Sequence, residues 1–186
     1  MNEIAGGVLA AKDFVAGAVS CGIKTKAGAL DLGVIFSETP AAAAAMFTTN
    51  KVCAAPVKVS REHVRGGRAR AVVVNSGNAN ACTGVRGLRD AQTMAQLAAN
   101  GLGLKPGEVL VASTGIIGRP LPMDKVKAGV QGALARMGRS AHHASRITQA
   151  IMTTDTRPKT VAVRFRLGGR EVRLGGITKG AGMIAP

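Results

Sequence analysis

The sequence predicts an α/β fold, a layered sandwich of a mixed β-sheet and helices. Strand-like runs of β-branched residues intermix with segments of helical period, and this alternation is typical of layered α/β domains. A closing pair of strands, 160–166 and 171–174, turns at Gly168-Gly169; it indicates a hairpin and argues against a purely parallel sheet. The chain has 186 residues, 46% of them hydrophobic, and we find neither a repeat nor a linker. We therefore expect residues 1–186 to form a single domain with its own core.

Short apolar runs of strand length recur along the first two thirds of the chain. They are 14–20, 32–36, 57–60, 70–75 and 108–113. The run 70–75 is the clearest strand, because it is rich in β-branched residues and an Asn/Gly loop, 76–84, follows at once. The alanine-rich segment 41–48 leaves helix and strand open, and its small side chains indicate a packing face.

Three segments have apolar residues at helical spacing and a helix signal at one end. The first, 90–100, ends before Gly101; the second begins near Pro122; Ser140 is a candidate N-cap of the third. Their apolar stripes are Ala91, Met94, Leu97 and Ala98, then Val126, Val130, Ala133, Leu134 and Met137, then Ala144, Ile147 and Ile151.

The charge is strongly positive and unevenly distributed. The net charge is +15, and residues 61–186 hold twenty Lys or Arg against six acids. Such a field attracts anions, whether nucleic acid, small carboxylates or an acidic partner chain. Composition alone does not choose among these.

Cysteine usage and the apolar pattern indicate a soluble cytoplasmic protein. The three cysteines are far apart and form no C-x-x-C pair, which fits a reducing compartment. The first eleven residues lack a basic region, and the longest apolar runs are only strand-sized. We expect no contact with a membrane.

Common cofactor and hydrolase motifs are absent from the sequence. There is no Walker A loop, no G-x-G-x-x-G after a strand and no G-x-S-x-G elbow. His142 and His143 are adjacent, so a helix would point them apart, and His63 is isolated. We predict no metal ion and no resident cofactor.

The last residues, 179–186, form a Gly-rich apolar segment with no charge after Lys179. A C-terminus more often lies in a polar, solvated tail. The pattern indicates either a truncation or a specific cut, and the residues alone leave the two open.

Seven short segments carry a family resemblance. In order, they are G-A-L-D-L at 28–32, A-A-P-V at 54–57, N-S-G-N-A-N-A-C-T-G at 75–84, S-T-G-I-I-G at 113–118, L-P-M-D-K at 121–125, T-T-D-T-R-P-K at 153–159 and K-G-A-G-M-I-A-P at 179–186. Taken together, they resemble the glutamate N-acetyltransferase family, also called ornithine acetyltransferases or bifunctional arginine-biosynthesis acetyltransferases.

The resemblance implies a divided protein. Members are made as one precursor that cuts itself directly before a Thr, a few residues beyond the segment that matches 182–186. This sequence resembles the α chain, and the nucleophilic Thr then belongs to a β chain that these residues do not include. The family further implies an N-terminal-nucleophile-like ornithine acetyltransferase fold and an α2β2 heterotetramer.

The resemblance also implies the reaction. The Thr takes acetyl from N-acetylornithine, releases ornithine and passes the acetyl group to glutamate in a ping-pong cycle. A Thr hydroxyl needs a nearby base, and the α-amine freed by the cut can serve as one. Whether acetyl-CoA is a second acetyl donor stays open.

Four residues receive site roles from the family match. Thr114 and Gly115, at the end of the predicted strand 108–113, are implied to form the oxyanion hole; fixed donors there stabilise the tetrahedral intermediate. Thr153 and Lys179 are implied to bind substrate, Lys179 by attracting a carboxylate. The asparagines in the loop after strand 70–75 are interpreted instead as a structural network of amides; they are Asn75, Asn78 and Asn80.

Three other interpretations remain. A basic nucleic-acid-binding module would explain the charge, but the sequence has no recognised motif and no Trp or Tyr for base stacking, so we expect no nucleic-acid partner. A self-processing N-terminal-nucleophile amidase or aminopeptidase would share the same logic, with water in place of glutamate. An inert structural subunit would be indifferent to loss of the Thr114 hydroxyl.

Overall fold

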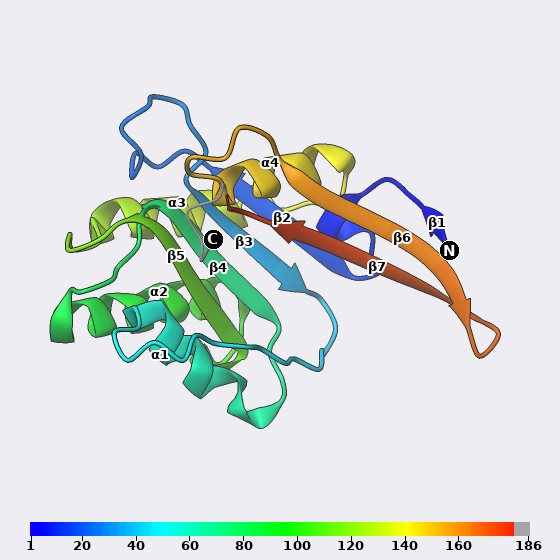
Figure 1. Ribbon diagram of the computed structural model, residues 1–186, viewed down its shortest axis with the longest axis horizontal. Helices are drawn as coiled ribbons and strands as arrows, with labels where there is room; N and C mark the ends of the chain where they lie inside the picture. Colours follow the sequence, from blue (N-terminus) through cyan, green and yellow to red (C-terminus); the bar gives the residue numbers. More distant parts are fainter. Residues whose placement is uncertain (181–186) are drawn as a thin grey trace.

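The computed structural model describes residues 1–180 and contains two β-sheets (Figure 1). The main sheet has the order β2-β3-β4-β5, formed by β2 (Phe14–Val19), β3 (Leu32–Ser37), β4 (Ala71–Asn78) and β5 (Val109–Ile116). β3 runs antiparallel to both of its neighbours, β2 and β4, whereas β4 and β5 run parallel. The predicted α/β fold with a mixed sheet is confirmed.

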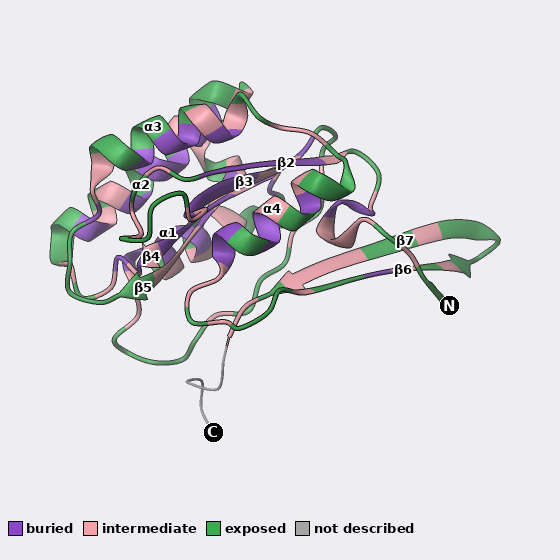
Figure 2. Ribbon diagram, turned by 90° about the horizontal axis from the view of Figure 1, so that it is seen from above, coloured by how far each residue is buried: buried purple, intermediate pink, exposed green. Residues whose placement is uncertain are grey.

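Helices cover both faces of the main sheet. One face packs against α1 (Ala55–His63), α2 (Gly84–Leu102) and α3 (Met123–Leu134). The other packs against α4 (Ala141–Ile151) and the short helix η1 (Gly7–Leu9). Two further single turns are η2 (Val64–Gly66) and η3 (Pro106–Glu108). Figure 2 shows the buried residues on the sides of these helices that face the sheet.

The core consists of small side chains, as the scarcity of aromatic residues requires. In α2, the residues that face the sheet are completely buried; they are Ala91, Met94, Ala95, Ala98 and Ala99. Small residues allow close approach of helix and sheet, which compensates for the low volume of each side chain. No helix in residues 1–180 combines the length and the apolarity that a membrane span requires.

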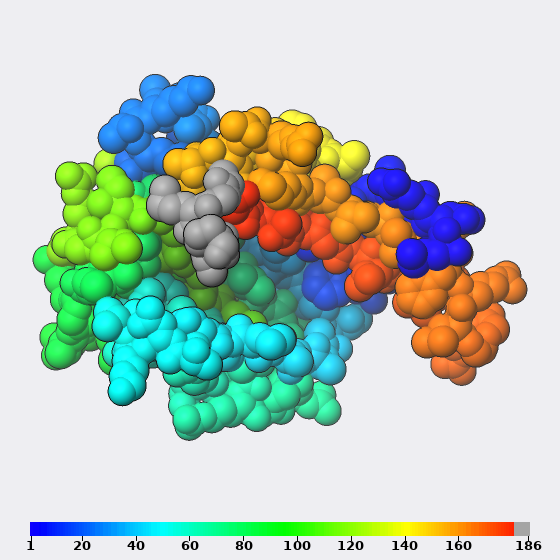
Figure 3. All heavy atoms as spheres, viewed as in Figure 1, coloured from blue at the N-terminus to red at the C-terminus, as the bar shows by residue number. Residues whose placement is uncertain are grey.

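Two expectations about local structure are wrong. The run 57–60 lies in helix α1, where Pro56 occupies the first turn and Val59 and Ser60 are buried. Four residues are too few to distinguish the helical spacing of apolar residues from the alternation of a strand. Contacts with the neighbouring helix and strand therefore determine the conformation of this run. The segment 41–48 is neither helix nor strand, apart from one bridge at Ala42, and none of its alanines is buried. It extends over the surface (cyan in Figure 3) instead of forming a packing face.

The predicted hairpin is present but belongs to a separate sheet. β6 (Lys159–Leu167) and β7 (Arg170–Thr178) pair with each other, and β1 (Asn2–Glu3) adds to β6. The mixed character of the main sheet therefore comes from the antiparallel pairs β2–β3 and β3–β4 beside the parallel pair β4–β5. The hairpin packs on η1 through Thr160 and Gly175, while the rest projects away from the body (Figures 1 and 2).

Candidate active site

Three residues from distant parts of the chain meet at one ammonium group. Lys179 Nζ donates to Thr114 Oγ1 at 2.9 Å and to Thr153 Oγ1 at 2.7 Å. Thr114 lies in β5, Thr153 in the turn after α4, and Lys179 directly after β7. All three side chains are half-buried. The fold thus brings together three residues to which the family resemblance gave oxyanion and substrate roles.

The donor pattern leaves this cluster ready for a ligand. An ammonium group only donates, so both threonine hydroxyls act as acceptors toward Lys179. Each hydroxyl hydrogen then remains free to be donated to a further acceptor. Among residues 1–180, Lys179 contacts two acceptors, and an ammonium has three N–H bonds. The cluster can offer hydrogen bonds to an anion or a carbonyl oxygen.

Gly115 lies beside Thr114 at a place that only glycine fits. Its φ is 133°, and a side chain there would collide with the backbone of Gly77 and Asn78. The pairing of β4 with β5 is irregular at this point. Gly115 is exposed, so a ligand or a partner chain can approach the end of β5 closely.

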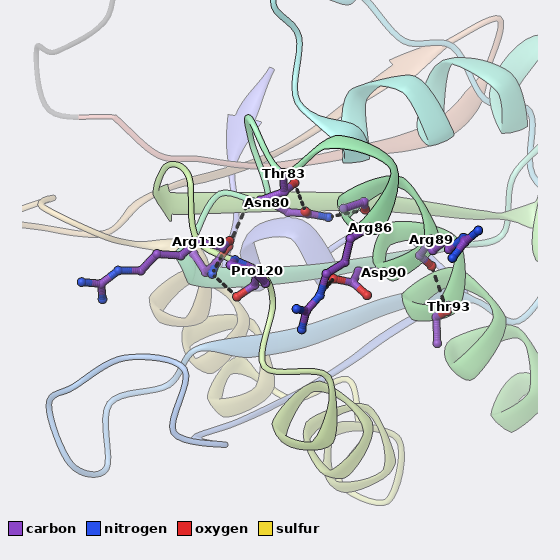
Figure 4. Close-up of polar contacts among 10 residues, drawn as sticks. Asn80, Thr83, Arg86, Arg89, Asp90, Thr93, Arg119 and Pro120 are labelled. Carbon is purple, nitrogen blue, oxygen red and sulfur yellow. Dashed lines mark hydrogen bonds and ion pairs between the residues drawn. The ribbon is translucent and has the colours of Figure 1, made fainter.

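Asparagine amides lock the loops around the ends of β4 and β5. Asn75 Nδ2 donates to the Asn78 carbonyl at 2.9 Å, and Asn78 Oδ1 accepts from the Asn80 N–H at 2.8 Å. Asn78 Nδ2 also donates to the carbonyls of Arg119 and Pro120 at 3.1 Å each (Figure 4). The predicted structural network of amides is confirmed.

The same network begins helix α2 earlier than its apolar period indicates. Asn80 Nδ2 donates to the Gly87 carbonyl at 2.8 Å, and Thr83 Oγ1 donates to Asn80 Oδ1 at 2.7 Å (Figure 4). Thr83 and Asn80 pack so closely on Gly87 that a Cβ there would collide with both. The helix therefore starts at Gly84, six residues before the predicted 90.

Asp155 received no role from the sequence, yet its carboxylate lies beside the cluster, bonded to the backbone of Thr153 and of Gly180, the residue after Lys179. Its carboxylate accepts from Lys159 Nζ at 2.8 Å, from the Gly180 N–H at 2.7 Å and from the Thr153 N–H at 3.2 Å. The hydrogen bond from Lys159, helped by the two backbone bonds, holds the pKa of Asp155 well below its usual range. A signal was present: Asp155 is the sole acid between residues 125 and 170 and precedes Lys159 by four positions.

Lys24 is a second residue that sequence analysis missed. Asp31, completely buried, accepts from the backbone N–H groups of Cys21 at 2.7 Å, Ile23 at 2.7 Å and Lys24 at 3.0 Å. This turn brings Lys24 near the cluster. Burial lowers the pKa of Lys24; the charge of Lys179 also lowers it, whereas the charges of Asp31 and Asp155 raise it. The site is therefore rich in positive charge and suited to an anionic ligand.

The comparisons with known proteins agree on one family. The ArgJ family model matches residues 15–186. The chain belongs to the ArgJ family. The "Arginine biosynthesis bifunctional protein ArgJ" of Symbiobacterium thermophilum is 50% identical over the whole chain, and that of Geobacter sulfurreducens is 51% identical over 94% of it. The chain spans about half the length of these relatives, 46% and 44% respectively.

Two solved ArgJ-family structures share the fold. An ArgJ crystal structure from Bacillus halodurans matches with a TM-score of 0.93 and 42% identity. Ornithine acetyltransferase from Mycobacterium tuberculosis, complexed with ornithine, matches with a TM-score of 0.92 and 44% identity. In both cases the match covers 100% of this chain and 97% of the solved chain. The resemblance to this family and to its fold is thereby confirmed.

Two other reactive side chains of this ArgJ-family chain, Cys21 and His143, have surroundings of their own and take no part in the hydrogen bonds of the cluster. Burial, with the hydrogen bond and charge of Asp31, raises the pKa of the Cys21 thiol to about 12, so this thiol is not a nucleophile near neutral pH. His143 Nδ1 lies 2.7 Å from Ser140 Oγ at the start of α4. Within residues 1–180, no three His, Cys, Asp or Glu side chains are close enough to share a metal ion.

Proposed function

We propose that this chain is the α chain, a single domain, of a self-cleaved ArgJ-family precursor, and that with its β chain it transfers acetyl from N-acetylornithine to glutamate. The contact of the Lys179 ammonium with the Thr114 and Thr153 hydroxyls carries the proposal. It joins an oxyanion donor to a substrate-binding cation, and acetyl transfer between amino acids needs both. The ornithine complex of the Mycobacterium tuberculosis relative supports the substrate class.

A divided precursor is supported by two lengths. This chain covers 46% of its Symbiobacterium relative but 97% of the chain in each solved structure. The remaining half then supplies the β chain, which begins with the nucleophilic Thr. An α2β2 heterotetramer follows from the family resemblance. The three cysteines, all free thiols, fit a cytoplasmic location.

In the first half-reaction, the β-chain Thr hydroxyl attacks the acetyl carbonyl of N-acetylornithine, and the α-amine of that Thr takes the hydroxyl proton. The Thr114 hydroxyl and a backbone N–H at Gly115 donate to the oxyanion. Because Thr114 already accepts from Lys179, its own hydrogen is available for this bond. The C–N bond then breaks, the proton returns to the leaving amine, and ornithine departs from an acetyl-Thr ester.

In the second half-reaction, the glutamate amine attacks the ester and the same donors stabilise the second oxyanion. The acyl C–O bond then breaks, the α-amine of the Thr passes the proton of the attacking amine to the Thr oxygen, and N-acetylglutamate departs from the regenerated Thr. Lys179 attracts the substrate carboxylate, Thr153 donates to it, and Lys24 adds to the positive field. Acetyl-CoA as an alternative donor would turn the same intermediate into a route for N-acetylglutamate synthesis. The word "bifunctional" in the names of the relatives supports this second donor.

The test uses the full-length precursor, purified after processing. Incubation with N-acetylornithine and glutamate should yield N-acetylglutamate and ornithine in equal amounts. Without glutamate, steady release of acetate would instead indicate the amidase alternative. Absence of both activities would overturn the proposal.

Replacing Thr114 by Ala should lower kcat by about 10²-fold or more, the usual effect of losing one oxyanion donor. The measurement is steady-state N-acetylglutamate formation by the processed enzyme. Thr93→Ala is the matched control, since the exposed Thr93 hydroxyl only bonds the Arg89 carbonyl within α2. An unchanged kcat in Thr114→Ala would remove Thr114 from the oxyanion hole and favour an inert structural subunit.

A further inference from the structure

Asp155 is a buried carboxylate that joins the two ends of the β6–β7 hairpin. It lies in the turn between α4 and β6, and its side chain is 1% exposed. Oδ1 accepts from Lys159 Nζ and from the Gly180 N–H, while Oδ2 accepts from the Thr153 N–H. Thr153 precedes the hairpin and Gly180 follows it, so the carboxylate connects entry and exit.

The contact with Gly180 takes over where the hairpin's own hydrogen bonds stop. The register of β6 with β7 ends at the pair Lys159↔Thr178. Lys179 and Gly180 lie beyond this pair, and the bond from the Gly180 N–H to Asp155 is 2.7 Å. Fixing the backbone at Gly180 also fixes the adjacent Lys179, whose ammonium must reach both Thr114 and Thr153.

The energetics require all three contacts of the carboxylate. A buried carboxylate is tolerated only when its oxygens receive hydrogen bonds and a positive charge. Here Lys159 provides the charge, and the backbone of Thr153 and Gly180 provides two further donors. The carboxylate therefore stays ionised and rigid, and its position sets the position of the two backbone segments.

We propose that Asp155 is the positioning residue of the candidate active site, holding Thr153 and Lys179 at the spacing that lets the Lys179 ammonium bridge to Thr114. Asp155 does not touch substrate. Its effect on turnover acts through Lys179 and Thr153, and this part of the inference rests on the proposed acetyl transfer.

Asp155→Asn, made in the full-length precursor, is the test variant because it keeps the shape of the side chain. The carbonyl oxygen of Asn still accepts hydrogen bonds, but its NH2 group only donates, so at least one of the three donors to Asp155 loses its partner. We expect kcat/KM for glutamate to fall by about 10- to 100-fold, since small misplacements of binding groups have effects of this size. Part of the fall should be a higher KM, because Lys179 is proposed to bind the substrate carboxylate.

Two comparisons separate positioning from stability. Glu171→Gln removes another ion-paired carboxylate of the same hairpin, bonded to Arg173 at 2.9 Å, and should leave kcat and KM unchanged. Val73→Ala, in the core of the main sheet, should lower Tm without changing KM below the melting temperature. If Asp155→Asn loses only stability, as Val73→Ala does, Asp155 is merely structural and the inference is overturned.

A double-mutant cycle tests whether Asp155 acts through Lys179. Residues that act through one contact show strong non-additivity. In a Lys179→Ala background, Asp155→Asn should reduce kcat/KM by less than about threefold, far less than its effect alone. Losses that multiply would show that Asp155 acts independently of Lys179, contrary to the inference.

A readout that does not need activity keeps this inference distinct from the proposed function. Reductive methylation followed by peptide mass spectrometry reports how freely the Lys179 amine reacts. In Asp155→Asn, the Lys179 amine should be methylated several-fold faster than in the enzyme of unchanged sequence. In Glu171→Gln, the rate of Lys179 methylation should stay the same as in that enzyme. Equal rates in all three proteins would overturn the positioning role even if acetyl transfer were confirmed; a faster rate without acetyl transfer would overturn the proposed function alone.

Discussion

At the scale of single residues, the site depends on which atoms are donors and which are acceptors. Lys179 donates to two hydroxyls, and those hydroxyls are thereby oriented to donate onward. The proposed roles of Thr114, Thr153 and Lys179 come from the family resemblance, because each residue lies within one of the matching motifs. Those of Asp155 and Lys24 do not, because their importance lies in burial and partners that no local pattern contains. Residue roles at the site other than these contacts stay predictions.

Cys21 offers a prediction at the same scale. Burial and Asp31 raise its pKa to about 12 from an ordinary 9.0, so the thiolate fraction near pH 8 is smaller by about 10³-fold. Iodoacetamide at pH 8 should therefore label Cys21 very slowly in the folded enzyme and readily after unfolding in urea. Peptide mass spectrometry measures both rates. Labelling of Cys21 in the folded enzyme as fast as in urea would contradict the raised pKa of this half-buried thiol.

At the scale of elements, tertiary contacts decide where the helices begin. The helical spacing of its apolar residues predicts α2. The first turn of this helix, however, depends on hydrogen bonds of Asn80 and Thr83, which precede the helix. Helix α1 shows the same limit. Ser60 Oγ both donates to the Val111 carbonyl, at 2.7 Å, and accepts from the Val111 N–H, at 2.8 Å, so the neighbouring strand β5 stabilises this helix.

A substitution at Asn80 tests whether its amide stabilises the first turn of α2. In Asn80→Asp, the side chain has no N–H for the Gly87 carbonyl and a charge becomes buried, which should cost about 2 kcal/mol or more. Tm of the processed enzyme should fall by roughly 4–8 °C, taking 2–4 °C per kcal/mol for a chain of this size. Asn50→Asp is the control, because Asn50 is exposed and uses its side-chain oxygen only as an acceptor from Val52. A Tm equal to that of the control would refute a structural role of the network.

At the scale of the whole molecule, the hairpin leaves one apolar face without cover from residues 1–180. The register places Val161, Val163, Phe165, Leu167, Val172 and Leu174 on this face. Val161, Leu167 and Leu174 are 53%, 69% and 62% exposed. A contiguous exposed apolar face is typical of an interaction surface. Under the proposed division of the precursor, the β chain covers it.

Leu174→Asp tests this surface in the full-length precursor. Desolvating a new carboxylate against an apolar partner is unfavourable, so the two chains of the processed enzyme should separate at lower urea concentrations. Size-exclusion chromatography across a urea series measures the separation. Arg166→Asp, on the opposite face of the hairpin, is the control and should leave the midpoint unchanged. Coincident midpoints for Leu174→Asp and the unmodified enzyme would exclude this face from the interface.

The amino-acid sequence by itself determined the α/β class, most strands, the three later helices and the family. These depend on local period, turn residues and short ordered motifs, all of which are present in the chain's linear order. Only the tertiary structure decided that 57–60 is helical, that the hairpin leaves the main sheet, and that Asp155 ties Thr153 to the backbone beside Lys179. The physical reason is that burial and long-range hydrogen bonds depend on residues that are far apart along the chain. Contacts between such residues leave no local pattern in the sequence from which they could be predicted.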